Sequence, residues 1–587
     1  MRAKIGIRPT IDGRCNGIRE SLETQTMTMA KLAKELIESN CFYSDGTPVE
    51  VVISSTTIGG SREAYICDEE FKKEGVTATL TVTPCWCYGT EVIDLSPNTT
   101  KAIWGFNGTE RPGAVFLAAA AAASAQRGLP IFTIYGHDVM DANDTTIPED
   151  VKEKILRFSR CAMAVGQMQN KSYVGLGGVS MGIAGSFLDG NVMQNYFGIR
   201  AEWVDMIEID RRIKQGIYDK DEYEKAYSWI KENCREGVDI NDHDKYKMAM
   251  NKDEQWQYIA KMTIIINDIM LGNPKLKELG FPEEALGRNA IAGGFQGQRQ
   301  WTDYLPNADF SEAIINTSFD WRGKKEPFIF ATENDNMNGM AMLMNKLVTN
   351  KASIFADVRT YWSPEAVKRV TGWTPDGLAK NGFIHMINSG AAALDGTGMC
   401  KNESGEGVMK EWWKITDSDI KACMNATEWS MANLGYFRGG GFSSNYSTMS
   451  VMPVTAVRLN MIDGLGLVLQ IAEGYTCLLP DEVDKTLQER TDKTWPSTWF
   501  VPNLTGEGAF KDVYSVMANW GANHAALAYG HVGADLITLA SMLRIPVNMH
   551  NVKEENIFRP HVWSAYGTKD LEGADFRACK TYGPLYK

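Results

Sequence analysis

The sequence has no long apolar run. The longest, residues 114–123, consists mostly of alanine, whereas a membrane-spanning helix needs about 20 apolar residues. The N-terminus, MRAKIGIRPTIDGR, also lacks the apolar core of a secretory signal. These absences predict a protein that neither crosses a membrane nor is secreted, and they favour the cytoplasm.

There is also no block of basic residues. Acidic side chains outnumber basic ones by 73 to 60, which gives a net charge of −13, and the lysines and arginines are scattered. Binding to nucleic acid or to an anionic membrane surface is therefore not indicated.

Cysteines are sparse for a disulfide-stabilised protein. The 11 cysteines are an odd, widely spaced set in 587 residues, and reduced thiols fit the cytoplasm. Cys85 and Cys87 lack the two-residue gap of a redox or zinc motif, so we predict that they pack in the interior.

The length predicts three domains, and a content of 44% hydrophobic and 10% aromatic residues is typical of globular proteins. The predicted fold class is α/β, with two doubly wound α/β domains followed by a C-terminal domain with an antiparallel β-sheet or barrel and helices. The expected bounds are 1–170, 171–352 and 353–587.

The first region alternates strand and helix patterns, as expected for a doubly wound sheet. The predicted strands are 4–8, 50–54, 77–83 and 131–135, and the predicted helices are 21–39, 61–73, 112–127 and 151–169.

A glycine-rich segment, GLGGVSMGIAG, opens the second region at Gly175. Ser180 stands where a dinucleotide fingerprint needs its third glycine, so a tight turn between strand and helix is the better interpretation. The stretch 219–273 is largely charged and predicted to be helical.

Beyond residue 357 the pattern becomes antiparallel. Residues 383–388, 453–461 and 467–478 are strand-like, and the last two are joined across a short turn containing Gly464 and Gly466. Residues 537–543 are predicted to be helical.

Two short apolar runs end in an acid: residues 328–332 precede Glu333, and residues 354–356 precede Asp357. The segment between them has helical spacing, which predicts a strand, a helix and a strand. Carboxylates delivered to strand ends can hold one hard cation or share acid and base roles. The alternative is that they are helix caps or surface acids.

His524 is the most suggestive histidine, because neighbouring glycine and alanine residues leave room for another group to approach it. His531 is the competitor, and His243 lies in a charged, solvated stretch. Two carboxylates and one imidazole favour a divalent ion that accepts oxygen and nitrogen ligands, such as Mn²⁺, Mg²⁺ or Co²⁺.

Longer motifs resemble a known family. IGIRPTIDGR, TVTPCWCYG, AIWGFNGTERPGAV, FQGQRQWTD, FATEND, FADVRTYWSPE, YFRGGGFS, TWPSTWF and MANWGANH occur in matching order along the chain, and they are similar to those of bacterial L-fucose isomerases. The resemblance implies an isomerase that interconverts L-fucose and L-fuculose with Mn²⁺ and commonly accepts D-arabinose. It also implies three domains and a homo-hexamer.

By the same resemblance, Glu333, Asp357 and His524 are the metal ligands, which agrees with the residues singled out above. It implies sugar-binding roles for Arg8, Gln296, Ser389, Tyr436, Trp495 and Asn523, and a Trp86 that reaches the site of a neighbouring subunit. Glu333 and Asp357 would move the protons of the reaction, and the sequence leaves open which of them is the base.

Other functions remain open from the residues alone. A glycoside hydrolase could use Glu333 and Asp357 without a metal. A non-catalytic sugar-binding protein would need neither acid. An isomerase could also prefer D-arabinose or another aldose, since one methyl group discriminates by only about 1–3 kcal/mol.

Overall fold

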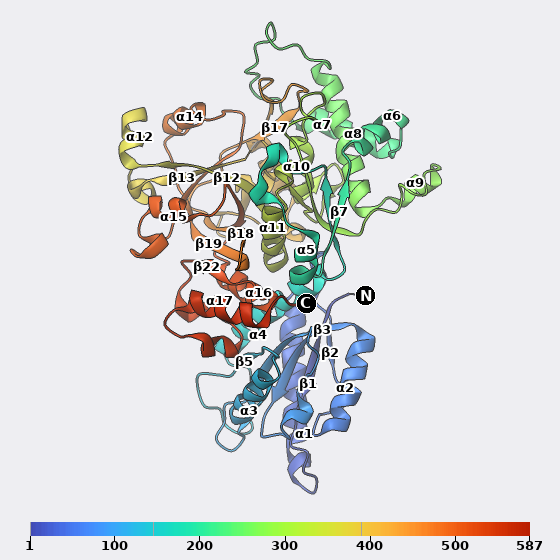
Figure 1. Cartoon of the computed structure of the whole chain (residues 1–587), viewed down its shortest axis with the longest axis vertical. Helices are drawn as coiled ribbons and strands as arrows, with labels where there is room; N and C mark the ends of the chain where they lie inside the picture. Colours follow the sequence, from blue (N-terminus) through green and yellow to red (C-terminus); the bar gives the residue numbers. More distant parts are fainter. Residues whose placement is uncertain (1, 145, 389) are drawn as a thin grey trace.

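The computed structural model describes residues 2–144, 146–388 and 390–587. The molecule is elongated, with the first domain forming the blue lower end in Figure 1 and the other elements the broader upper part. It combines two parallel sheets with a closed antiparallel barrel, which confirms the predicted fold class.

The first sheet is parallel, with the strand order β2-β1-β3-β4-β5. The predicted strands and helices are present, and β4 is an additional strand that the sequence interpretation missed. The strands are β1 (Lys4–Pro9), β2 (Val51–Ile53), β3 (Val76–Thr83), β4 (Thr100–Gly105) and β5 (Phe132–Ile134), and the helices are α1 (Ile18–Asn40), α2 (Ser61–Glu74), α3 (Gly113–Gln126) and α4 (Glu149–Met168).

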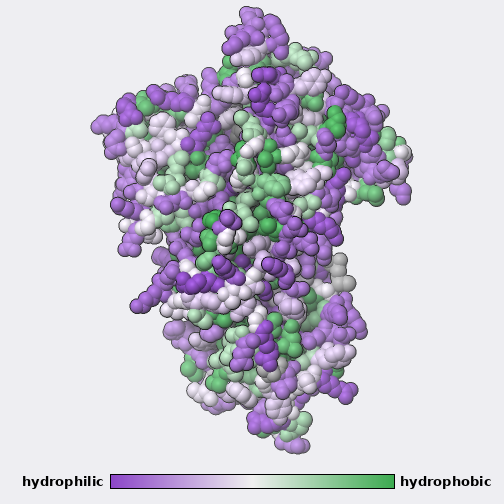
Figure 2. All heavy atoms as spheres, in the orientation of Figure 1, coloured by the Kyte–Doolittle hydropathy of each residue, from purple (hydrophilic) through white to green (hydrophobic). Residues whose placement is uncertain are grey.

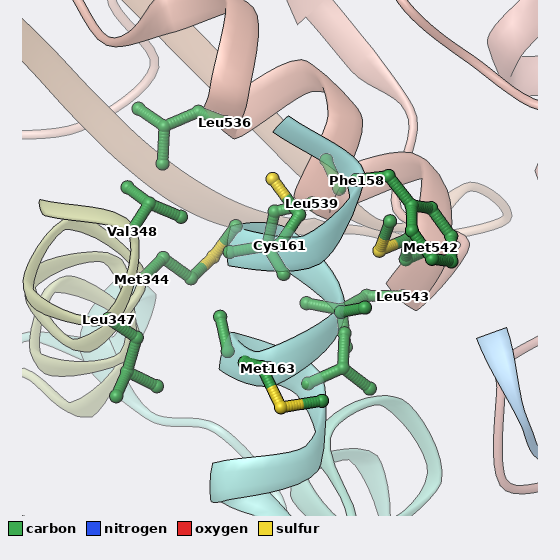
Figure 3. Packing of buried hydrophobic residues seen from close by; sticks show 14 of the residues in the cluster. Phe158, Cys161, Met163, Met344, Leu347, Val348, Leu536, Leu539, Met542 and Leu543 are labelled. Atoms are coloured by element: carbon green, nitrogen blue, oxygen red, sulfur yellow. The ribbon is translucent and has the colours of Figure 1, made fainter. Parts of the chain in front are cut away.

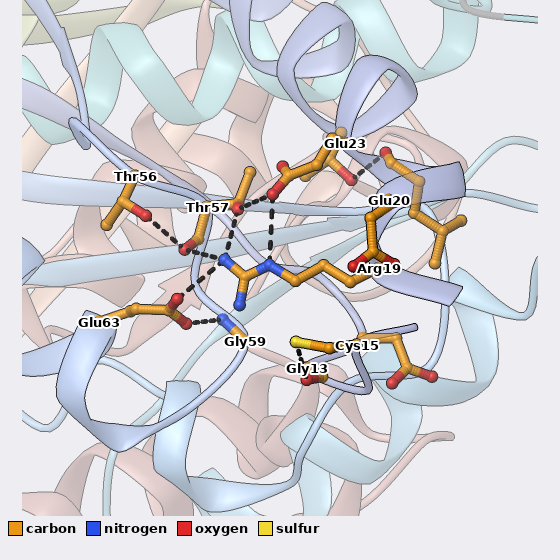
Figure 4. Close-up of polar contacts among 12 residues, drawn as sticks. Gly13, Cys15, Arg19, Glu20, Glu23, Thr56, Thr57, Gly59 and Glu63 are labelled. Carbon is orange, nitrogen blue, oxygen red and sulfur yellow. Dashed lines mark hydrogen bonds and ion pairs between the residues drawn. The ribbon is translucent and has the colours of Figure 1, made fainter. Parts of the chain in front are cut away.

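Arg19, at the start of α1, ties that helix to the loop after β2. Its guanidinium donates to the hydroxyl of Thr57 at 2.9 Å and forms an ion pair with Glu63 at 2.8 Å (Figure 4). The carboxylate of Glu63 also accepts from the backbone N–H of Gly59. The loops at this edge of the first sheet are thus held by side chains from two helices.

The second sheet is also parallel, in the order β11-β8-β6-β7. The charged stretch is helical only in part, because residues between α7 and α8 are irregular. The elements are β6 (Ser172–Leu176), β7 (Arg200–Val204), β8 (Ala290–Phe295), the hairpin of β9 (Phe319–Asp320) and β10 (Gly323–Lys324), β11 (Ile329–Ala331), α5 (Gly190–Phe197), α6 (Ile207–Gln215), α7 (Lys220–Asn233), α8 (Lys252–Leu271), α9 (Pro274–Glu278), α10 (Asp309–Asn316) and α11 (Asn336–Thr349).

The third sheet has the order β18-β21-β12-β13-β20-β19-β22, and pairing between β18 and β19 closes it into a barrel. The predicted hairpin is β18 and β19. The strands are β12 (Ile354–Trp362), β13 (Phe383–Ile387), β18 (Pro453–Ile462), β19 (Gly466–Thr476), β20 (Ser497–Pro502), β21 (His524–Tyr529) and β22 (Val547–Met549), with the short pairs β14 (Cys400–Lys401) and β15 (Gly407–Val408), and β16 (Glu428–Met431) and β17 (Phe442–Asn445). The helices are α12 (Pro364–Thr371), α13 (Asp417–Ala426), α14 (Asp481–Glu489), α15 (Val513–Asn519), α16 (Gly533–Leu543) and α17 (Leu571–Tyr582).

Two details of the expected strand, helix and strand were wrong. β11 and β12 belong to different sheets, so α11 leads from the second parallel sheet into the barrel. Asp357 does not end its strand, because β12 continues to Trp362. The alternation of polar residues with Val358 and Trp362 sustains the strand beyond the acid, and an irregularity in the pairing with β13 falls directly after Val358.

The core is continuous where the three regions meet. Side chains of α4, α11 and α16 interdigitate in one buried cluster, shown in Figure 3 by Phe158, Met344 and Leu539 among others. One helix from each region therefore contributes a buried apolar face that joins the three sheets.

Polar residues cover much of the face shown in Figure 2, with apolar residues scattered between them. Among the described residues, no helix combines the length and apolar character required to cross a bilayer.

Candidate active site

Glu333 lies in a strained turn directly after β11. Its backbone adopts φ 58° and ψ 12°, and Asn334 also has a positive φ of 50°. Each such conformation costs roughly 1–3 kcal/mol in a residue other than glycine and is retained only where the surroundings fix it. The turn projects Glu333 from the strand end towards the barrel.

The glycine-rich segment supports this turn. The side-chain amide of Asn334 donates to the carbonyl of Gly178 at 2.8 Å and accepts from the hydroxyl of Tyr173 at 3.2 Å. At Gly175, an added Cβ would collide with Trp203 and approach the Asn334 amide at 3.0 Å. The connection from β6 to α5 is longer than the predicted tight turn, since two short 3-10 turns, Ser180–Gly182 and Ala184–Ser186, lie between them. Its glycines leave room for the residue that holds Glu333 in place.

Asp357 and His524 are opposite each other on paired strands. In the antiparallel pairing of β12 with β21, these two residues are partners, and side chains at such positions lie on the same face. The distance from His524 Nε2 to Asp357 Oδ1 is 3.3 Å. The register of the barrel therefore sets this contact.

The imidazole of His524 brings both acids together. Its Nε2 lies 3.4 Å from Glu333 Oε2, in addition to its contact with Asp357. The side-chain amide of Asn523 is 2.9 Å from the same nitrogen. The two other histidines considered in the sequence lie elsewhere: His531 faces the carbonyl of Gly474, and His243 pairs with Asp239.

A buried acid and arginine orient the imidazole from behind. Asp335 Oδ2 lies 2.6 Å from His524 Nδ1 and 2.5 Å from Arg458 Nη1, and all three side chains are almost fully buried. Asp335 Oδ1 also accepts from the backbone N–H of Asn338 and so caps α11. Because Nδ1 is engaged, the ring presents Nε2 to the two carboxylates.

The electrostatics follow from these contacts. Burial would raise the pKa of Asp335, but the charge of Arg458 and the hydrogen bond from His524 lower it to about 2. Burial likewise disfavours the charged imidazole, yet hydrogen bonds to Asp335, Asp357 and Glu333 hold the pKa of His524 well above its ordinary value. The imidazolium is thus the positive centre of an acidic cluster.

The sequence interpretation missed Asp335 and Arg458. Asp335 stands two residues after Glu333, at the start of a predicted helix, where a capping acid is a detectable signal. Arg458 interrupts an apolar strand, and a buried charge there requires a partner. Its guanidinium also donates to the carbonyl of Gly185, in the glycine-rich segment.

Two further buried acids lie beneath the site at the start of α10. Asp309 accepts from the hydroxyl of Ser443 at 2.6 Å, and burial, together with the charge of Glu333, raises its pKa to about 8. Burial and the charge of Asp309 also raise the pKa of Glu312. Burial therefore disfavours the charged form of both acids.

Among the residues expected to bind sugar, Asn523 and Trp495 are close to the acids. Arg359 lies between Trp495 and Asp357, because its guanidinium is 5.6 Å from the centre of the Trp495 ring and 3.8 Å from Asp357. Tyr436 lies in a turn after β16 and is 61% exposed.

Gln296 follows β8 and accepts from the backbone N–H of Gly178 at 2.8 Å. It borders a cavity of about 390 Å³ that is also lined by the glycine-rich segment. In that segment, the carbonyl of Gly178 accepts from Asn334. Ser389 lies outside the described residues.

Arg8 and Trp86 lie in the first domain, away from the barrel (Figure 1). Arg8 is buried and forms an ion pair with Asp68 at 2.5 Å. Trp86 is 43% exposed and packs edge-on against Phe116. The chain thus assembles the acids and His524 but leaves these two residues elsewhere.

Models of three domains match the chain along most of its length. They are described as the first N-terminal domain, second N-terminal domain and C-terminal domain of L-fucose isomerase, and they match residues 2–170, 171–350 and 386–550. The chain belongs to the L-fucose isomerase family. This confirms the resemblance drawn from the motifs.

Curated relatives give the same result over the full length. L-fucose isomerases of Bacteroides fragilis strain YCH46, Clostridium perfringens strain 13 and Streptococcus pneumoniae strain Hungary19A-6 are 62%, 60% and 60% identical to the chain, with 100% of this chain and 99% of each relative covered. Since the family consists of aldose–ketose isomerases, the chain is an enzyme of that class.

Proposed function

We propose that the enzyme interconverts L-fucose and L-fuculose, and also D-arabinose and D-ribulose, in the degradation of L-fucose. One observation carries this proposal. In a chain of this family, two carboxylates from different sheets converge on one nitrogen of a buried histidine. These are the groups that a transfer of protons between neighbouring carbons requires.

We further propose a divalent cation, Mn²⁺ with Mg²⁺ or Co²⁺ as substitutes, held by Glu333, Asp357 and His524. Two carboxylate oxygens and one imidazole nitrogen suit such ions. Neighbouring ligands of a six-coordinate ion lie about 3 Å apart, and the two distances from His524 Nε2, 3.3 and 3.4 Å, are close to that.

The proposal requires a local rearrangement. As arranged, no group of three or more histidine, cysteine, aspartate or glutamate side chains in the described part of the chain could hold a metal ion. His524 Nε2 instead contacts the carboxylates directly. Exchanging these contacts for bonds to the cation needs movement of the two partly exposed carboxylates and loss of the Nε2 proton of His524. Asp335 keeps the ring in place from the other side.

The chemistry consists of two proton transfers. One proton must pass from C2 to C1 of the sugar and a second from O2 to O1, through a cis-enediol whose oxygens carry developing negative charge. When bound, the cation would supply the positive charge that stabilises these oxygens. Glu333 and Asp357 would act as base and acid, one taking the proton from C2 and the other serving C1.

We propose a homo-hexamer in the cytoplasm. An exposed Trp86 on a loop of the first domain supports a contact with a neighbouring subunit. Eleven cysteines without a disulfide support a reducing compartment. Light scattering tests the assembly, and a stable monomer of 65.2 kDa would contradict it.

The deciding experiment is ketose formation from L-fucose and from D-arabinose by chelator-treated enzyme, with and without added Mn²⁺. The proposal predicts product only with the cation, and the ratio of the two rates gives the preferred sugar. Ketose formed at full rate without any cation would contradict the metal role. Hydrolysis of a glycoside in place of ketose formation would contradict the reaction.

A further inference from the structure

A cavity lies at the junction of the first two domains, away from the acids and His524. It has a volume of about 410 Å³, which is within the range of roughly 300–1,000 Å³ found for small-molecule sites. Its walls come from the start of the chain, the end of α4, the C-terminal half of α8, the β10–β11 segment and α11.

The wall is basic, although the protein is acidic. Five basic side chains and two acidic ones line the cavity, whereas acids exceed bases over the whole chain. The basic ones are Arg2, Lys171, Arg322, Lys325 and Lys346, and the acidic ones are Asp45 and Glu326. A surplus of positive charge in a cavity attracts anions.

Three of these cations already have a carboxylate partner. Arg2 forms an ion pair with Asp45, Lys346 with Glu326 at 2.6 Å, and Arg322 with a carboxylate behind the wall, that of Asp320, at 2.5 Å. These pairs compensate their own charge. The surplus therefore rests on the two remaining lysines.

Lys325 and Lys171 are held by neutral oxygens. Lys325 Nζ donates to the carbonyls of Ile315 and Thr317 at 3.0 and 2.5 Å, and Lys171 Nζ donates to the side-chain oxygen of Asn289 at 2.9 Å. An ammonium group has three N–H donors, so Lys325 keeps one for a ligand.

The surroundings of Lys325 reflect its lack of a close carboxylate. Burial, together with the positive charges of Arg322 and Lys346, lowers its pKa to about 8, although more distant acids oppose this shift. At neutral pH the group is still mostly charged, and an anion placed beside it would stabilise that charge.

We propose that this cavity binds a small organic anion carrying a phosphate or carboxylate group, with Lys325 and Lys171 compensating its charge. The site is independent of the proposed isomerase centre. Because residues of both N-terminal domains line it, a bound anion would also tie these domains together and stabilise the fold.

Calorimetric titration tests the proposal with inorganic phosphate and with citrate, at constant ionic strength. The unaltered enzyme is expected to bind one anion per chain, and Lys325→Met to weaken binding at least tenfold. Lys485→Met, at an exposed lysine on α14, is the matched control and should bind as the unaltered enzyme does. Binding of phosphate alone assigns a phosphate ligand, and binding of citrate alone assigns a carboxylate ligand.

Ketose formation without added anion and the melting temperature show whether each variant is folded. If Lys325→Met does not fold, Lys171→Met serves in its place, because it removes only a hydrogen bond to the exposed Asn289 and should leave the fold intact. The same loss of anion affinity is expected. Equal affinity in the lysine variants and the control would overturn the proposal, since the anion would then bind elsewhere. Failure of both anions to bind the unaltered enzyme would overturn it as well.

Discussion

The two sides of the candidate active site differ in how they are built. Behind His524, the contacts to Asp335 and Arg458 are short, buried and made within one chain. Of the residues expected to bind the sugar, Tyr436 is exposed, and Trp86 and Arg8 lie in the first domain, away from this site. The fold of one chain therefore fixes the groups proposed to do the chemistry, whereas it leaves the side proposed to recognise the sugar open.

The largest effect is expected from the acids themselves. Glu333→Gln keeps the shape of the side chain but removes its ability to take up a proton, so kcat should fall by about 10²- to 10⁴-fold. Glu507→Gln, at an exposed loop position, is the control. Steady-state ketose formation measures both, and a Glu333→Gln enzyme with full kcat would show that this acid takes no part.

A smaller but clear effect is expected behind the imidazole. Asp335→Asn still caps α11, but it removes the charge that orients His524, so Mn²⁺ affinity should fall by roughly 10- to 100-fold. Electron paramagnetic resonance of free Mn²⁺ measures this without reference to activity. Unchanged affinity would mean that Asp335 only stabilises the fold.

The same substitution leaves Arg458 buried without its ion-pair partner, which should cost about 3–5 kcal/mol of stability. The double variant Asp335→Asn with Arg458→Met removes the unpaired charge, so part of this stability should return while Mn²⁺ affinity stays low. Denaturant unfolding compares the two. Recovery of Mn²⁺ affinity together with stability would contradict a positioning role.

On the open side, the effect should be small. Tyr436 is largely exposed, so Tyr436→Ala is expected to raise KM for L-fucose by a few-fold through lost stacking on the sugar, with kcat little changed. A fall in kcat as large as that of Glu333→Gln would show that both sides are equally involved in the chemistry.

A separate effect concerns stability alone and comes from a buried acid on α8, outside the candidate active site. Burial raises the pKa of Asp268 to about 7. In the unfolded chain this acid ionises near pH 4, so between about pH 4 and 7 the folded state holds a proton that the unfolded state has lost. Stability from this group should fall as pH rises through that window and level off above it.

Asp268→Asn should flatten this slope, with a difference on the order of a few kcal/mol between the ends of the window. Denaturant unfolding at several pH values provides the measurement. An identical pH dependence in both proteins would show that Asp268 is ionised in the folded state.

The sequence predicted the elements well and their partners less well. The apolar run before Asp357 identified a strand, but it could not show that β12 pairs with β21 and so places Asp357 opposite His524. Pairing across 167 residues depends on the closed barrel, which no local pattern encodes. Asp335 was missed because a capping acid and an orienting acid look alike in sequence.

The motifs singled out the two acids and His524, and the structure brings these three side chains together. Their role as metal ligands remains a prediction. The sugar-binding residues remain predictions. Arg8 is buried among its own domain's side chains, and Trp86 is exposed in the first domain, so the proposed sugar-binding roles would require contacts between subunits.

Exchange of the C2 hydrogen of L-fucose with solvent tests the central claim most directly. In deuterium oxide with Mn²⁺, the unaltered enzyme should introduce deuterium into the sugar, measured by NMR, whereas Glu333→Gln and Asp357→Asn should each reduce this exchange at least a hundredfold while remaining folded. Undiminished exchange in both variants would contradict the account, because neither carboxylate would then move the proton.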